Sequence, residues 1–347
     1  AAISVDTLAF VTKTDDNIVR IDSEGYAPFE QNLDDLSFVE SEAGDSKALV
    51  KGIAKYFVDN GFNVGGFTAS VTSCVPAAAG VSSSASFELL IAEIFNVLYN
   101  DGAVSKMKKA QASQYAENVY FLKPCGLMDQ SAISLGGVSM IDFENVENPF
   151  VLGVQYPFTD TDIVITNTGG NHADLTSDYA AIRAEMEEVS EKFSEKYLRL
   201  VDYQKFLDAI PVLQNEVSGR AIMRAIHFFD ENLRVDKAVS AINMKNADAF
   251  YKIVGESGDS SFKLLQNCYV PADTVQRIPL GIVLSQHVTG VKAVRVHGGG
   301  FAGTILAFVP NEKAETHEYV SRMSEVFGAE HVYKLSIRQE GACRVEF

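Results

Sequence analysis

At 347 residues the chain exceeds the length at which one hydrophobic core usually stops growing, so two domains are expected. A formal net charge of −17 argues against nucleic acid and anionic membranes as partners, so an anionic substrate would need a local pocket of hydrogen-bond donors. The four cysteines are widely spaced and form no CxxC pair, which favours a reduced, cytoplasmic setting over a disulfide framework or a zinc site.

In the first half of the chain, the spacing of apolar residues predicts strands over 2–11, 17–22 and 63–72 and helices over 46–59 and 105–122. A loop of small residues, 76–86, contains Ser82, Ser83 and Ser84 and leads into a helix that reaches about residue 100. A strand, a loop with few side chains and a helix N-terminus present backbone N–H groups that can hold a phosphate. The alternative is that the serines only cap the helix, since serine is a preferred capping residue.

The second half opens with a strand over 138–142 and further strand patterns over 150–167, and is then mostly helical over 177–288. It closes with two strands over 291–296 and 303–309, a helix over 312–327 and a strand over 330–337. This β–loop–β–α–β ending predicts an α+β sandwich rather than a doubly wound sheet.

Two carboxylates flank a rigid bend in the first half. Glu117 lies near the end of one predicted helix, and Asp129 lies in the first turn of the next, where the positive helix end favours an ionised carboxylate. Pro124 and Gly126 force the chain to bend between them, so the two carboxylates can converge on one site, one binding a metal and the other facing a nucleophile. Taken singly, each is typical of a surface acid or a helix start.

A run of three glycines, Gly298–Gly300, separates two predicted strands near the end of the chain. Glycine adopts positive φ readily and lets another backbone approach closely. By itself the run is typical of a hairpin turn.

Taken in order, the serine loop, the segment E-N-V-Y-F-L-K-P-C-G-L-M-D-Q and the late G-x-G-F-x-G resemble the signature of galactokinases, which share a superfamily with homoserine, mevalonate and phosphomevalonate kinases. Segments that begin at His172 and Arg224 resemble two further motifs of that family, so the resemblance covers nearly the whole chain. It implies an α+β fold of two domains with the active site in the cleft between them. An N-terminal ribosomal-protein-S5-like α/β domain would span 1–155, and a C-terminal ferredoxin-like α/β sandwich with helical insertions would span 156–347.

The resemblance further implies an ATP-dependent enzyme that phosphorylates the C1 hydroxyl of galactose, with Mg²⁺ as cofactor, ATP and a monosaccharide as partners, and a monomer or weak homo-oligomer as its state. Asp129 is expected to face that hydroxyl as a general base or an electrostatic aid, and Ser84 and Glu117 are expected to hold Mg²⁺. The remaining implied residues are the phosphate-binding Gly80, Ser82, Ser83, Ser84, Gly298 and Gly300 and the sugar-binding Gly126, Asp129 and Tyr179.

The chain also departs from the family pattern. Leu122 stands where glycine is common, and His297 stands where threonine is usual. Family members carry an N-terminal sugar-recognition segment ending R-x-N-L-I-G-E-H-x-D, and we expect Ala1 to align just beyond it, so that the first strands and this segment are missing. Two alternatives stay open: a kinase for another monosaccharide or derivative (an N-acetylhexosamine, arabinose or a uronic acid), and a non-catalytic regulator that binds sugar and ATP.

Overall fold

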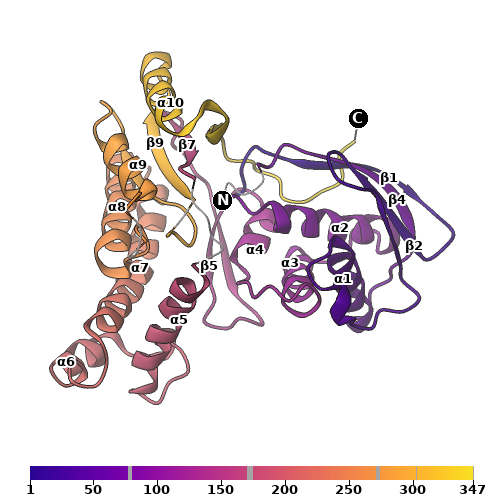
Figure 1. Ribbon diagram of the computed structural model, residues 1–347, viewed down its shortest axis with the longest axis horizontal. Helices are drawn as coiled ribbons and strands as arrows, with labels where there is room; N and C mark the ends of the chain where they lie inside the picture. The colour runs from indigo at the N-terminus through magenta and orange to yellow at the C-terminus, as the bar shows by residue number, and fades with distance from the viewer. Residues whose placement is uncertain (77–79, 170–174, 271–273, 302, 347) are drawn as a thin grey trace.

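A computed structural model describes residues 1–76, 80–169, 175–270, 274–301 and 303–346 of the chain. Part of the predicted serine loop (77–79) and part of the segment that begins at His172 therefore lie outside the described residues, as does position 302 of the predicted glycine motif. The molecule is elongated, with one four-stranded sheet and its helices toward each end (Figure 1).

The sheet at the right of Figure 1 has the strand order β1-β4-β2-β3 and packs against three helices. Its elements are β1 (Thr7–Lys13), β2 (Ile18–Ser23), β3 (Phe29–Asn32), α1 (Ser46–Asp59), β4 (Phe67–Ser73), α2 (Ser83–Tyr99) and α3 (Lys106–Tyr115). β2 and β4 run parallel, and the other neighbours run antiparallel. Fully buried aromatic rings join sheet to helices, since the Phe95 ring lies 5.6 Å from that of Phe67 and 5.8 Å from that of Phe57.

A π-helical turn, a short helix and a hairpin connect this half to the rest of the chain. They are η2 (Ala116–Tyr120), α4 (Met128–Leu135), β5 (Val138–Asp142) and β6 (Phe150–Val154). The hairpin β5–β6 runs between the two ends of the molecule (Figure 1). The chain turns at Gly136 and Gly137, which both have positive φ. Position 136 requires a glycine, because the C-terminal tail packs so closely there that a Cβ would lie 2.3 Å from the Gly341 backbone nitrogen.

The second sheet has the order β10-β7-β9-β8 and is antiparallel throughout. Its strands are β7 (Thr161–Asn167), β8 (Ala293–Val296), β9 (Thr304–Pro310) and β10 (Val332–Leu335). Along β9, Ile305 and Ala307 pack with α9 (Arg277–Gln286) and α10 (Lys313–Phe327), whereas Phe308 packs with α7 (Gly219–Asn243) and α8 (Ala247–Ser260). Because side chains alternate between the faces of a strand, β9 is apolar on both sides and helices cover both faces.

The helical region between β7 and β8 forms a further core of its own around Phe206 and Phe229. It comprises α5 (Thr176–Glu191), α6 (Tyr203–Leu213), α7 (Gly219–Asn243), α8 (Ala247–Ser260) and the π-helical η4 (Ser261–Leu265); short 3₁₀ turns lie at Glu40–Glu42, Leu198–Leu200 and Ala329–His331.

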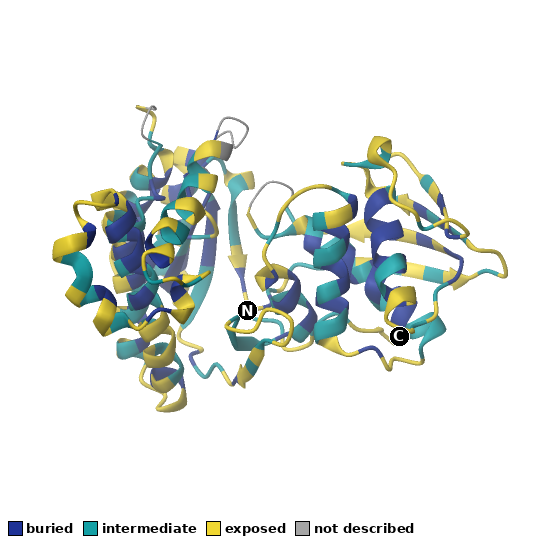
Figure 2. Ribbon diagram, turned by 90° about the horizontal axis from the view of Figure 1, so that it is seen from below, coloured by how far each residue is buried: buried dark blue, intermediate teal, exposed yellow. Residues whose placement is uncertain are grey.

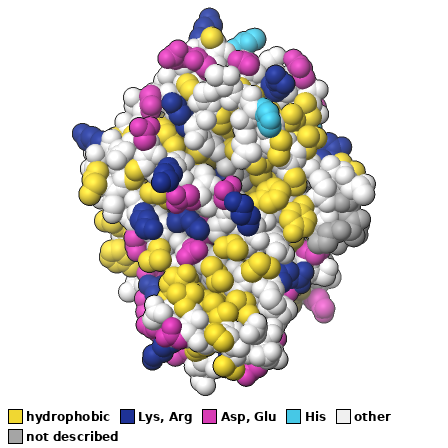
Figure 3. Space-filling view, turned by 90° about the vertical axis from the view of Figure 1, so that its left-hand side faces the viewer, with side chains coloured by type: hydrophobic (Ala, Val, Ile, Leu, Met, Phe, Trp, Pro, Cys, Tyr) yellow, Lys and Arg dark blue, Asp and Glu magenta, His cyan; other side chains and the backbone are white. Residues whose placement is uncertain are grey.

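Buried residues concentrate where helices face the sheets in both halves (Figure 2). On the face at the left of Figure 1, basic side chains lie beside acidic ones, and apolar side chains gather in the lower part (Figure 3).

Most predicted elements are confirmed, and α1 has the predicted bounds of 46–59. The predicted strand over 2–11 begins only at Thr7, because the residues before it pair with the C-terminal tail through an Ile3–Ile337 bridge. The predicted helix over 105–122 is α3 followed by η2, and the strand β3 was not predicted. In the described residues no helix is long and apolar enough to span a membrane. The division of the chain after residue 155 stays a prediction.

A matched pair of substitutions in α1 tests the core of the first sheet. Val50 is fully buried and Val58 is 46% exposed, so the same chemical change removes methyl groups from the core at one position and from water at the other. We expect Val50→Ala to lower the free energy of unfolding by about 2–3 kcal/mol and Val58→Ala to change it by less than about 0.5 kcal/mol, measured by urea denaturation. Equal losses in the two variants would contradict this packing.

Candidate active site

The three serines at the start of α2 do not act as helix caps. Ser82 precedes the helix with left-handed backbone angles (φ 62°, ψ 50°), and among the described residues its side chain makes no capping hydrogen bond. Its hydroxyl donates instead to Asp129 Oδ2, at 2.5 Å. The first N–H groups of α2 are therefore left for another acceptor, which favours the phosphate interpretation of this loop over the capping one.

The serine loop meets the start of β9, the strand that follows the loop containing Gly298–Gly300 (the glycine loop). Gly80 has a positive φ of 69°, and a Cβ there would lie 3.2 Å from the hydroxyl of buried Thr304, at the start of β9. Positive φ is rare for residues with a side chain, and a Cβ at this distance would crowd the Thr304 hydroxyl, so the position favours glycine. The contact supports the expectation that the glycine loop supports the phosphate loop.

The glycine loop is itself held by two side chains. The hydroxyl of Tyr179 donates to the Gly300 carbonyl at 2.7 Å, and the buried amide of Asn267 donates to the Gly299 carbonyl at 3.0 Å. Positive φ at Gly298 (68°) and Gly300 (81°) allows the tight turn between β8 and β9. Asn267 could not be predicted from the sequence, because it is distant in the chain from the glycine loop and belongs to no motif.

Glu117 lies in the π-helical turn η2, with its carboxylate buried and bound on both oxygens. Lys123 Nζ lies 2.7 Å from Oε1, and the Ser84 hydroxyl donates to the same oxygen at 3.4 Å. Gln130 Nε2 donates to Oε2 at 3.0 Å. Widening of a helix by a π turn often marks functional sites, and here it places a carboxylate inside the protein rather than on its surface.

The Pro-Cys-Gly bend is fastened to the same π turn. Asn118 accepts a hydrogen bond from the Cys125 backbone N–H at 2.6 Å and donates to the Cys125 carbonyl at 3.3 Å. This two-sided contact fixes the bend that carries the chain from Glu117 to Asp129 and the start of α4. Sequence reasoning identified the bend but not Asn118, because the contact depends on how the chain folds back.

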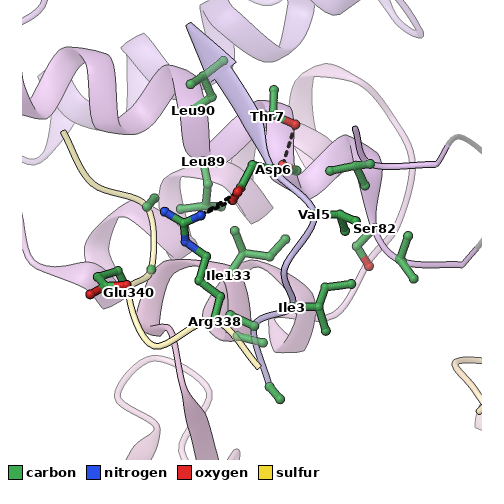
Figure 4. Close-up of a pocket in the computed structure, with 18 of the residues that line it drawn as sticks. Ile3, Val5, Asp6, Thr7, Ser82, Leu89, Leu90, Ile133, Arg338 and Glu340 are labelled. Carbon is green, nitrogen blue, oxygen red and sulfur yellow. Dashed lines mark hydrogen bonds and ion pairs between the residues drawn. The ribbon is translucent and has the colours of Figure 1, made fainter. Parts of the chain in front are cut away.

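Two cavities meet at Asp129. The smaller, of about 380 Å³, contains most of the predicted site residues; its lining includes Gly80, Ser82, Ser84, Glu117, Gly126, Asp129, Tyr179, Gly298 and Gly300. The larger, of about 900 Å³, lies between the segment before β1, the helices α2 and α4 and the C-terminal tail (Figure 4). Apolar side chains such as Ile3, Leu89 and Ile133 line it, and the Arg338 guanidinium binds Asp6 at 2.6 Å in its wall.

The walls of both cavities include Ser82, Met128, Asp129 and His297. The exposed carboxylate of Asp129 is therefore accessible from both sides. Two molecules bound in the two cavities would meet at this residue. Of the predicted phosphate-binding residues, Ser83 lies at the exposed first position of α2 and does not line the smaller cavity.

A second carboxyl group, Glu88, lies beneath Glu117 and was not predicted to belong to the site. Its side chain is completely buried, Oε2 accepts from Gln130 Nε2 at 3.4 Å, and Oε1 has no hydrogen-bond partner among the described residues. Burial, reinforced by the charge of Glu117, raises the pKa of Glu88 to about 8. Burial therefore favours the protonated form of Glu88 at neutral pH, which lowers its repulsion with Glu117.

A predicted pH dependence follows from Glu88. In the unfolded chain its pKa is near 4.5, so the folded state keeps a proton that the unfolded state has released between that pH and about 8. The contribution of Glu88 to the free energy of unfolding is therefore fully present below pH 4.5 and is lost as the pH rises toward 8. The glutamine in Glu88→Gln is neutral at every pH, so we expect this variant to lack the fall. The difference in free energy of unfolding between Glu88→Gln and the wild type should grow by roughly a few kcal/mol from pH 5 to pH 8.5, the size expected for such a pKa shift.

Urea denaturation at the two pH values, in EDTA, measures this difference. Glu318→Gln, an exposed carboxylate on α10, is the control and should show the same pH dependence as the wild type. A parallel loss of stability with pH in Glu88→Gln and the wild type would show that Glu88 is ionised in the folded protein.

The chain is similar to known kinases. Residues 48–137, which include α2, Glu117 and Asp129, match the family described as "GHMP kinases N terminal domain". The galactokinase of Glaesserella parasuis is 32% identical over 90% of this chain and 80% of its own length. The galactokinase of Clostridium tetani is 29% identical over 90% of this chain and 79% of its own.

The structural neighbours agree. The crystal structure of Lactococcus lactis galactokinase complexed with galactose superposes with a TM-score of 0.79 at 26% identity, covering 97% of this chain and 87% of that one. The crystal structure of L. major mevalonate kinase in complex with R-mevalonate, at 10% identity and a TM-score of 0.62 over 97% of this chain and 87% of that one, shares the fold. The resemblance first drawn from the serine loop, the two carboxylates and the glycine loop is confirmed, and the chain belongs to the galactokinase family of the GHMP kinases.

Proposed function

We propose that the chain transfers the γ-phosphoryl group of ATP to the C1 hydroxyl of galactose, giving galactose 1-phosphate. The observation that carries this proposal is the position of Asp129, at the junction of a polar cavity that begins at the N-terminus of α2 and a larger apolar one. Membership of the galactokinase family supports the sugar, and the L. lactis relative was crystallised with galactose.

In the smaller cavity, backbone groups would bind the triphosphate. The uncapped N-terminus of α2 supplies N–H donors and the positive end of the helix dipole, and Gly80, Gly298 and Gly300 leave room for phosphate oxygens to approach the backbone. Phosphoryl transfer depends mainly on positioning and on neutralising negative charge. In a chain of net charge −17, such a local set of donors is required.

The oxygens of Ser84 and Glu117 fit the binding of Mg²⁺. A hydroxyl and a carboxylate oxygen lie 3.4 Å apart on the cavity wall, and an ammonium group already lies against that oxygen, so this point attracts a cation. Mg²⁺ takes carboxylate, hydroxyl and phosphate oxygens, and the described residues contain no cluster of three or more His, Cys, Asp or Glu that could hold a metal without substrate oxygens. When bound, the ion would neutralise charge on the phosphates.

Asp129 would act on the sugar. Its Oδ2 accepts from Ser82, which orients the carboxylate, and Oδ1 would receive the proton of the C1 hydroxyl or stabilise its release. Gly126 and Tyr179 border the smaller cavity beside Asp129 and would contact the sugar there. The Tyr179 hydroxyl also donates to the Gly300 carbonyl. The two domains 1–155 and 156–347, S5-like and ferredoxin-like, with the site in the cleft between them, form part of this proposal.

Substitution of Asp129 tests the proposal most directly. We expect Asp129→Asn to lower kcat for galactose phosphorylation by about 10³-fold, because the amide can neither accept the proton nor stabilise the developing charge, while ADP binding and the melting temperature stay unchanged. ADP release in a coupled assay measures kcat. Asp208→Asn, an exposed residue of α6, is the control with the same loss of charge.

Three outcomes would overturn parts of this assignment. Near-wild-type turnover by Asp129→Asn would remove Asp129 from the reaction. A wild-type protein that binds nucleotide and sugar without releasing ADP would be a non-catalytic regulator, and faster turnover with another sugar in a panel would replace galactose.

Ser82 offers a test that separates orientation of Asp129 from phosphate binding. Ser82→Gly removes the hydroxyl and suits the left-handed backbone at this position, so the fold should not lose stability. If the hydroxyl orients Asp129, kcat falls about tenfold and KM for ATP stays constant. A rise in KM with unchanged kcat would instead place the hydroxyl on the triphosphate.

A further inference from the structure

Lys123 was assigned no role from the sequence, yet it lies in the wall of the smaller cavity. Its ammonium forms an ion pair with Glu117 Oε1 at 2.7 Å, while its side chain remains 59% exposed. The Glu117 side chain is 4% exposed, so a buried carboxylate pairs with a cation that is largely exposed to solvent. An ion pair of this kind costs little to open on the lysine side, because the ammonium can return to water.

The backbone directs Lys123 toward Glu117. Leu122, the residue before it, has a positive φ of 62°, a conformation that is rare and strained for a leucine. This turn lets the Lys123 backbone N–H donate to the Glu117 carbonyl at 3.0 Å, and the side chain then reaches the carboxylate of the same residue. Strain held at such a position is a reason to look for a function.

Charge makes Lys123 distinctive within the cavity. Of the described residues that line it, Lys123 is the only lysine or arginine, and burial lowers the pKa of His297, which keeps that ring neutral. The whole chain carries a net charge of −17, and both Glu117 and Asp129 border the same space. A triphosphate entering this cavity would find one cationic side chain, and that side chain is already bound to Glu117.

We propose that Lys123 is a phosphate-binding residue that exchanges partners: it neutralises Glu117 when the cavity is empty and binds ATP phosphate oxygens when a divalent cation occupies Glu117. This inference rests on the proposed function and adds a residue to its nucleotide site. An ammonium has three N–H donors, and the contact with Glu117 uses one, which leaves capacity for a phosphate. The exchange predicts effects of opposite sign on nucleotide and metal binding.

The variant Lys123→Met tests both effects. Without the ammonium, the dissociation constant of ADP, measured by calorimetry with Mg²⁺ present, should rise about tenfold, the size expected for a lost charge-assisted hydrogen bond. The dissociation constant of Mn²⁺ without nucleotide, measured by EPR of the free ion, should fall several-fold, because the ion no longer competes with an ammonium for Glu117. Lys123→Arg should restore most of the ADP affinity.

Lys252→Met is the matched control, since it removes an exposed lysine from an ion pair with Glu256 on α8 and changes the net charge equally. It should alter neither constant. Lys123→Gln repeats the test if Lys123→Met does not fold, as judged by circular dichroism.

ADP affinity within twofold of the wild type in Lys123→Met would overturn the phosphate contact, and unchanged or weaker Mn²⁺ binding would overturn the competition for Glu117. The two binding constants do not depend on the sugar. If the wild type binds ADP but phosphorylates no sugar, the proposed function fails while the comparison of variants still decides the role of Lys123.

Discussion

The buried carboxylate of Glu117 ties the first half of the active site together. Ser84 from the first turn of α2, Gln130 from the first turn of α4 and Lys123 from the connecting bend all bind it. A buried charge is tolerated only when its hydrogen bonds are satisfied, so this one group requires three segments to keep their relative positions. Protonation of Glu88 beneath it removes the repulsion that a second buried charge would add.

The second half of the molecule contributes shape more than charge. Gly80 approaches Thr304, and the glycine loop beside it is held by Tyr179 and Asn267 from the helical region. β9, which begins at this contact, is covered on both faces by helices and belongs to a rigid core. The described backbone at Gly299 and Gly300 is thus held by side chains from outside the loop, as positioning of a phosphate requires.

Particular residues show why sequence reasoning succeeded in some places and failed in others. Glu117 and Asp129 could be paired because a short, rigid bend of the chain separates them and their residue types suit a metal and a hydroxyl. Glu88, Asn118, Lys123 and Asn267 could not be found this way, since each acts through a partner set by folding. Ser82 as a phosphate-binding residue stays a prediction, and the contact that its hydroxyl makes with Asp129 could not be read from the sequence.

The amino-acid sequence by itself determined the order and type of nearly all elements, the motifs of a galactokinase and the two carboxylates, because local periodicity and residue chemistry carry that information. It also showed that an anionic substrate would need local donors, since the net charge is −17. Only the tertiary structure decided which cationic side chain binds Glu117, which carboxyl group has a raised pKa and where the two cavities meet. Those properties depend on distance and burial between segments far apart in the chain, and neither can be read from spacing along it.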